Sequence, residues 1–176
     1  SQYSKERIIK HFGIKSHKIH ITPNGVLTPQ DDLIIPNIKK KYNIDKYILT
    51  VSRIEPRKGH QMLLKAYVEL ELYKRDIKLV MIGVQDINNN SFNDYYQSLS
   101  NNIKENILIT QVSYEELVAF YKNALLFVFP SYAEGFGIPP LEATASGCTT
   151  LCSNQTAMKD FSFLNNKMFN PYDINE

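Results

Sequence analysis

The stretch FPSYAEGFGIPPLEATASG, residues 129–147, organises the fold that we expect for this chain. It follows an apolar run typical of a buried strand, Leu125 to Phe129, which ends at Pro130. Pro139 and Pro140 suit the first turn of a helix, because the first helical N–H groups have no partner within the helix. The stretch therefore predicts a strand, a glycine-containing turn and a helix that begins beside these prolines.

The turn between this strand and this helix is a candidate anion site. Gly135 and Gly137 flank Phe136, and glycine lets an anion approach the main chain closely. The free N–H groups and the positive dipole end of a helix bind phosphate readily. Glu134 precedes the turn and Glu142 lies one turn into the helix, where an anion alone would repel both carboxylates. The arrangement makes more sense if the carboxylates hold hydroxyl groups, as in a sugar-nucleotide site.

The rest of the chain alternates short apolar runs with segments of helical spacing. We expect strands at residues 18–22, 47–52, 78–83, 106–110, 125–129 and 149–153. We expect helices at residues 4–13, 38–42, 61–74, 92–103, 115–123 and 138–146. Such alternation predicts an α/β fold with a doubly wound parallel sheet. Ligands bind these sheets at the carboxyl ends of the strands, where the loops that hold Arg53 and Glu134 both lie.

Composition limits the classes of function. The 176 residues are 43% hydrophobic and 22% charged, as in one globular domain that buries its own core. The net charge of +2 implies no nucleic-acid surface, and Lys39-Lys40-Lys41 is either a solvated helix face or a contact with an anionic membrane. Cys148 and Cys152 fit a reducing compartment rather than a disulfide framework. Because neither a membrane-spanning run nor a signal peptide occurs, we expect a cytoplasmic location.

Glu134 to Glu142 resembles the E-x7-E motif of retaining glycosyltransferases with the GT-B fold (glycosyltransferase family 4, group 1). The wording E-G-F-G-I-P-P-L-E-A, residues 134–143, is specific to that group. The resemblance implies the Rossmann-like C-terminal half of a GT-B fold, which binds the nucleotide-sugar donor. It also implies transfer of a hexose from GDP- or UDP-sugar to a surface-glycan or lipid-linked acceptor. The sequences P-R-K and G-I-P-P-L-E resemble those of bacterial mannosyltransferases, which implies mannose as the transferred hexose.

Both ends of the chain are similar to internal segments of that family. Residues 1–6 and 18–26 resemble the segment between its two domains, and residues 169–176 resemble an F-x-P-x-D-x-x-E run that precedes its last helices. The resemblance implies an inter-domain hinge at residues 1–25 and a donor-binding domain at residues 26–176. The N-terminal acceptor domain and the final helices would then be absent, and this part alone would not transfer sugar.

Arg53 and Lys58 occupy the places of the family's R-x4-K pair, which implies contact with the donor diphosphate. Fixed cations there would stabilise the charge of a leaving nucleoside diphosphate. Arg57 is adjacent to Lys58, but the spacing favours Lys58. No D-x-D motif for a metal occurs, so we expect no metal and no cofactor, with the cations and the helix terminus in the metal's place.

The resemblance also assigns roles within the E-x7-E stretch. Glu134 would be the catalytic carboxylate, in contact with hydroxyls of the donor sugar, and Glu142 would bind the ribose. The diphosphate would accept hydrogen bonds from the amides of Gly135, Phe136 and Gly137. Both front-face attack and a transient covalent species on Glu134 stay open as routes to retention.

A base pocket is expected after the strand at residues 106–110. Thr110 and Val112 lie in a loop similar to the family segment that packs on the base, although Thr110 replaces the family's glycine. Val112 is either a contact with the base or a core residue at the end of the strand. Ser113 and Glu116 form a capping box for the next helix, which is a structural role.

Two other functions remain open at this stage. A sugar-nucleotide epimerase of the same architecture would need no acceptor, and a non-catalytic nucleotide-sugar module would tolerate Glu134→Ala. The sequence disfavours an NAD-binding domain and a P-loop NTPase, because neither G-x-G-x-x-G nor G-x-x-x-x-G-K-[ST] occurs. The expected partners are the nucleotide-sugar donor, a glycan or lipid-linked acceptor held by the missing domain, and the cytoplasmic face of a membrane in the longer protein.

Overall fold

The computed structural model describes residues 1–26, 33–86 and 89–175 of the chain. At its centre lies a six-stranded sheet of order β3-β2-β1-β4-β5-β6, in which every pair of neighbours is parallel. The strands are β1 (Lys46–Val51), β2 (Ile77–Ile82), β3 (Ile107–Thr110), β4 (Leu126–Phe129), β5 (Thr150–Ser153) and β6 (Met168–Phe169). The predicted doubly wound α/β fold is thereby confirmed.

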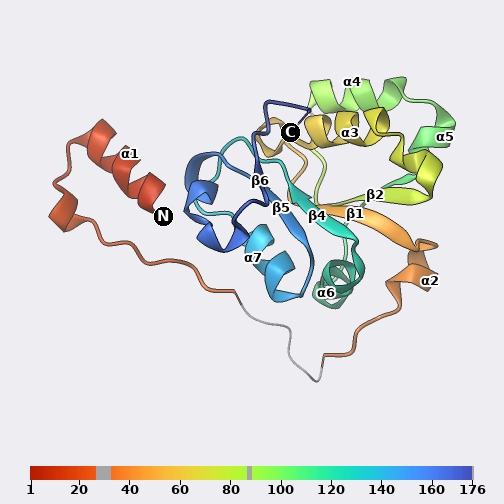
Figure 1. Ribbon diagram of the computed structural model, residues 1–176, viewed down its shortest axis with the longest axis horizontal. Coiled ribbons are helices and arrows are strands. Elements are labelled where there is room, and N and C mark those ends of the chain that lie inside the picture. Colours follow the sequence, from red (N-terminus) through yellow and green to blue (C-terminus); the bar gives the residue numbers. More distant parts are fainter. Residues whose placement is uncertain (27–32, 87–88, 176) are drawn as a thin grey trace.

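Helices cover both faces of the sheet (Figure 1). One face carries α3 (His60–Glu69), α4 (Asn90–Ser98) and α5 (Asn101–Lys104). The other carries α2 (Ile38–Tyr42), α6 (Tyr114–Asn123) and α7 (Ile138–Ala145). Side chains of β2 alternate between the two cores, Leu79 and Met81 on the first and Val80 and Ile82 on the second. Burial on both faces explains why the strands are continuous apolar runs.

The order of strands places a topological switch point between β1 and β4. The chain proceeds from β1 to β2 and β3 in one direction, and from β4 to β5 and β6 in the other. The crossovers therefore leave on opposite faces, and the loops after β1 and β4 meet with no helix between them. In open α/β sheets this crevice is where ligands bind.

One predicted strand is wrong. Residues 18–22 form no strand: Lys18 ends the 3₁₀ helix η1 (Ser16–Lys18), and residues 19–22 lie in no helix or strand. Their alternating pattern suits a strand, but a strand needs a neighbour for its hydrogen bonds, and Figure 1 shows this segment away from the sheet. The helix before it, α1 (Gln2–Phe12), is confirmed and ends at Gly13 in the left-handed conformation.

Two predicted helices are shorter than expected. Helix α3 ends at Glu69 and is followed by the 3₁₀ helix η3 (Leu72–Arg75). The helix expected at residues 92–103 is divided into α4 and α5, because Leu99 and Ser100 adopt extended backbone conformations. Strand β6 and the 3₁₀ helices η4 (Thr156–Asp160) and η5 (Ser162–Leu164) were not predicted from the sequence. Segments of two to five residues are too short to show a periodic pattern.

Candidate functional site

The loops after β1 and β4 are joined by an ion pair. The Nζ atom of Lys58 lies 2.5 Å from Oε1 of Glu134, and the two side chains are only 12% and 10% exposed. Lys58 comes from the 3₁₀ helix η2 (Pro56–Lys58) after β1, and Glu134 comes from the loop after β4. Two candidate residues of the sequence analysis, from separate loops, therefore share one site at the switch point.

Close approach of the two main chains brings this pair together. Gly59 has φ 72°, and a Cβ atom there would lie 2.1 Å from the carbonyl oxygen of Pro130, so only glycine fits without movement. The amide of Tyr132 donates to the carbonyl oxygen of Arg57 at 2.8 Å, and the hydroxyl oxygen of Ser131 lies 3.2 Å from the same carbonyl oxygen. The η2 segment and the loop after β4 thus behave as one structural unit.

Three side chains donate to the carboxylate of Glu134. Oε1 accepts from Lys58 and, at 2.8 Å, from the hydroxyl of Ser131, while Oε2 accepts only a longer bond of 3.3 Å from Arg57 among the residues described. The amide of Glu134 donates to Oγ1 of Thr156 at 2.9 Å. Oε1 is therefore fully engaged, and Oε2 keeps the capacity to accept a bond from a ligand.

The three cationic side chains after β1, those of Arg53, Arg57 and Lys58, differ in their contacts. Arg57 donates to the carbonyl oxygen of Ala133 at 3.0 Å and pairs with Glu55 at 2.7 Å, besides its bond to Glu134. Arg53 is exposed and contacts no carboxylate in the described part of the chain. Sequence spacing favoured Lys58 over Arg57, yet both reach Glu134. Ser131 and Thr156, which hold Glu134 in place, were missed by the sequence analysis.

The turn at residues 135–137 leads directly into α7. Gly137 is the residue that caps this helix, with φ 95°, and the helix contains proline in its first turn as predicted. Among the described residues, none accepts a hydrogen bond from the amides of Gly135, Phe136 or Gly137. The ring of Phe136 packs edge-on against Phe161, with centroids 5.8 Å apart. Phe136 can therefore offer a ligand its amide, while its side chain belongs to the core.

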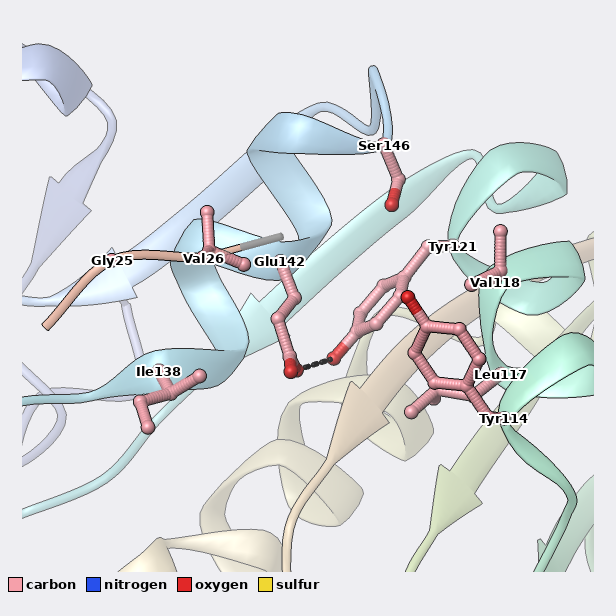
Figure 2. A pocket seen from close by; sticks show the side chains of 9 residues that line it. All are labelled: Gly25, Val26, Tyr114, Leu117, Val118, Tyr121, Ile138, Glu142 and Ser146. Carbon is pink, nitrogen blue, oxygen red and sulfur yellow. Dashed lines mark hydrogen bonds between the residues drawn. The ribbon is translucent and has the colours of Figure 1, made fainter. Parts of the chain in front are cut away.

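Glu142 lies in a separate pocket between α6 and α7 (Figure 2). The pocket has a volume of about 190 Å³ and is lined by Gly25, Val26, Tyr114, Leu117, Val118, Tyr121, Ile138, Glu142 and Ser146. Oε2 of Glu142 accepts a hydrogen bond of 3.1 Å from the hydroxyl of Tyr121. Burial, reinforced by Glu142, raises the pKa of Tyr121, which keeps this hydroxyl protonated and able to donate. The pocket thus offers one oriented carboxylate within mainly apolar walls.

The two expected base contacts do not line this pocket. Thr110 ends β3, and its carbonyl oxygen accepts a bond from the amide of Gly83 while its hydroxyl donates to the carbonyl oxygen of Gln111. Val112 is partly buried and packs against the core on the α6 face. The capping box of Ser113 and Glu116 at the start of α6 is confirmed.

The histidine and cysteine side chains nearest the ion pair are buried and uncharged at neutral pH. Burial, together with the charge of Lys58, lowers the pKa of His60 from 6.5 to about 4. Burial, with a smaller contribution from Glu134, raises the pKa of Cys152 to about 12. Neither group has a pKa that suits acid–base catalysis near pH 7.

Within the described ranges, residues 1–26, 33–86 and 89–175, no three His, Cys, Asp or Glu side chains are grouped so that they could hold a metal ion. None of the helices there combines the length and apolar character needed to cross a bilayer. The lysine triplet is partly neutralised, because Lys39 pairs with Asp45 and Lys41 pairs with Glu116.

The parallel sheet with helices on both faces is that of a doubly wound α/β domain of the GT-B type. Within that class, the chain belongs to the family of glycosyl transferases group 1, whose family model matches residues 32–163. The serotype-specific mannosyltransferase WbdA of Escherichia coli is 36% identical over 145 residues, which are 81% of this chain and 18% of that protein. The O-antigen chain mannosyltransferase B of Escherichia coli is 29% identical over 168 residues, 91% of this chain and 43% of that protein. The chain thus spans less than half the length of these relatives.

Two solved structures share the fold. A glycosyltransferase from Rickettsia africae superposes with a TM-score of 0.80 and 23% identity over 99% of this chain and 48% of that one. The C-terminal domain of a glycosyl transferase group 1 family protein, LpcC, from Francisella tularensis superposes with a TM-score of 0.68 and 22% identity over 86% of this chain and 83% of that one. At such identities the likeness shows the architecture alone.

Proposed function

We propose that this chain is the donor-binding part of a retaining hexosyltransferase. It would bind a GDP- or UDP-linked hexose, with mannose as the first choice, for transfer to a surface-glycan or lipid-linked acceptor held by the rest of the enzyme. The observation that carries this proposal is the Lys58–Glu134 pair at the switch point, beside the free amides of residues 135–137. The relatives WbdA and O-antigen chain mannosyltransferase B are named as mannosyltransferases, which supports mannose as the transferred sugar.

The diphosphate would lie between the η2 loop and the start of α7. Arg53 is exposed and can turn its guanidinium fork toward phosphate oxygens. The amides of Gly135, Phe136 and Gly137 would donate to the same anion, aided by the dipole of α7. These groups together would stabilise the charge that develops on the leaving nucleoside diphosphate, without a metal or a cofactor.

Glu134 would act on the sugar. Its Oε2 atom is the less engaged oxygen and can accept a bond from a sugar hydroxyl, while the negative charge of the carboxylate stabilises positive charge at the anomeric carbon. Lys58 and Arg57 lie on the same carboxylate and limit its repulsion of the diphosphate. This arrangement lets a carboxylate and a polyphosphate occupy adjacent positions.

Glu142 would bind the ribose from the pocket between α6 and α7, because a carboxylate held in mainly apolar walls is suited to paired hydroxyl groups. Contact of Thr110 and Val112 with the base stays a prediction, and the packing of Val112 supports its interpretation as a core residue. A cytoplasmic enzyme that works at the membrane face remains the expected setting, as does the division into a hinge at residues 1–25 and a domain at residues 26–176.

Calorimetric titration of the chain with UDP, GDP and ADP tests the proposal. We expect one of them to bind with at least ~4 kcal/mol, which is the millimolar scale. Arg53→Ala should weaken that binding about tenfold, because one charge-assisted bond to phosphate is lost. The double variant Arg53→Ala/Lys58→Ala should weaken it further. Arg75→Ala serves as the matched control. It removes an exposed arginine that precedes the amino end of β2, whereas the candidate site lies at the carboxyl ends of the strands. Failure of both UDP and GDP to bind would refute the proposal.

A further inference from the structure

Each carboxylate of the E-x7-E motif accepts a hydrogen bond from a buried hydroxyl group. Tyr121 donates to Oε2 of Glu142 at 3.1 Å, and Ser131 donates to Oε1 of Glu134 at 2.8 Å. Tyr121 lines the pocket but is only 2% exposed, and Ser131 is fully buried, so the proton of each hydroxyl is donated to its carboxylate rather than offered to a ligand. On the basis of the proposed function, we infer that Tyr121 and Ser131 are positioning residues, which act on ribose and sugar through these carboxylates.

Tyr121 is buried and packed within the core. It lies on α6, and its ring packs edge-on against Phe127 of β4, with centroids 5.5 Å apart. Glu142 reaches across from α7 to meet its hydroxyl (Figure 2). A flexible glutamate is thereby fixed through one oxygen, and its Oε1 atom accepts no bond from any described residue. The carboxylate is left with one oxygen available in the pocket.

Ser131 does the corresponding work at Glu134. With Lys58, it occupies Oε1 of that carboxylate, which leaves Oε2 as the oxygen that can reach a ligand. Longer contacts of the same hydroxyl, 3.2 Å to Arg57 and 3.4 Å to Ala133, are both to carbonyl oxygens. Because a hydroxyl has one proton, the shorter bond to the charged carboxylate takes precedence.

A packing role alone would not require these hydroxyl groups. Tyr121 lies at a core position of α6, where phenylalanine would fill nearly the same space, and a buried hydroxyl without a partner is unfavourable. Tyr67 provides a matched comparison on the other face of the sheet. It is also buried, and its hydroxyl donates to the carbonyl oxygen of Ile77 at 2.8 Å, away from both carboxylates.

The test is a crossed set of variants and ligands, measured by chemical-shift titration of the ¹⁵N-labelled chain. The probes are GDP, 2′,3′-dideoxy-GDP and GDP-mannose, with the corresponding UDP compounds and UDP-glucose in parallel. Tyr121→Phe should weaken GDP and GDP-mannose equally, by about five- to tenfold, and leave the dideoxy nucleotide unaffected, since it has no ribose hydroxyls. Ser131→Ala should weaken the nucleotide sugar by more than it weakens the nucleotide, and Ser131→Thr, which keeps the hydroxyl, should restore most of that difference.

Tyr67→Phe should leave all affinities unchanged, which controls for the loss of a buried hydroxyl as such. Equal losses across the three probes in Tyr121→Phe or in Ser131→Ala would overturn the positioning inference and leave the proposed function standing. If the unaltered chain bound neither GDP nor UDP, the proposed function would fail, and this inference with it. Thermal denaturation of each variant verifies that the fold is retained.

Discussion

Gly59→Ala should weaken the fold at the point where the η2 loop meets the loop after β4. Gly59 has φ 72°, and an added Cβ atom would lie 2.1 Å from the oxygen and 2.9 Å from the carbon of the Pro130 carbonyl group. Both neighbours are main-chain atoms of Pro130, the residue that follows β4, so no side-chain rotation relieves the overlap. The two loops must separate, or the backbone at residue 59 must change.

The size of the loss follows from these two contributions. A left-handed backbone conformation costs alanine about 1–2 kcal/mol relative to glycine. Separation of the loops would break the bonds from the amide of Tyr132 to the carbonyl oxygen of Arg57 and from the guanidinium of Arg57 to the carbonyl oxygen of Ala133. At about 1 kcal/mol for each of these two bonds, the total loss in the free energy of unfolding is about 3–4 kcal/mol.

Gly147→Ala is the matched control, because Gly147 has φ 81° but no atom within 4 Å of an added Cβ. The Gly147→Ala variant introduces the backbone strain alone and should lower the free energy of unfolding by about 1–2 kcal/mol. Urea denaturation followed by circular dichroism measures both variants, and we expect Gly59→Ala to lose about 2 kcal/mol more, with an unchanged m-value. Equal losses in the two variants would refute the argument that close approach of the loops requires glycine at position 59.

Two further predictions concern charge in this region. Lys58→Met should lower the free energy of unfolding by about 2 kcal/mol, because Glu134 loses its nearest cation. The double variant Lys58→Met/Glu134→Gln should lose about 1 kcal/mol less than the sum of the losses in the two single variants. Additive losses in urea denaturation would contradict coupling within the pair. His60 has its pKa lowered from 6.5 to about 4, so the unfolded chain binds its proton first, and stability should fall by about 3 kcal/mol as the pH falls from 6.5 to 4. His60→Gln should lack that part of the pH dependence; identical pH profiles for the two proteins would argue against it.

The fold could be predicted because its main elements have strong local patterns. Apolar runs such as residues 47–52 read as strands buried on both faces, and the structure places β1 at residues 46–51. The predictions of secondary structure failed where strand pairing or a local bend of the backbone determines the conformation. Residues 18–22 alternate as a strand does, yet no strand of the sheet is beside them. The break at Leu99 and Ser100 carries neither proline nor glycine, so no residue signals it.

The candidate site was predictable at the level of loops but not of hydrogen bonds. The βα alternation places Lys58 and Glu134 at the same edge of the sheet, and they meet there. Periodicity says only that position 121 faces the core and cannot say which group its hydroxyl meets. The choice of tyrosine over phenylalanine at such a position is the one signal that indicates a polar partner. For Ser131 and Thr156, the contacts depend on loop conformation, which no sequence pattern here defines.

The Lys58–Glu134 pair resolves a conflict that the sequence pattern poses. A carboxylate next to a diphosphate site should repel the ligand, and in a partly buried site that repulsion is weakly screened. Here the carboxylate lies within hydrogen-bond distance of Lys58 and Arg57, so the neighbourhood presents cations as well as an acceptor for hydroxyl groups. Removal of Lys58 would therefore harm diphosphate binding in two ways, because an attractive charge is lost and the charge of Glu134 is left less compensated. Arg53 has no such carboxylate beside it in the described structure, so its removal would have only the first effect.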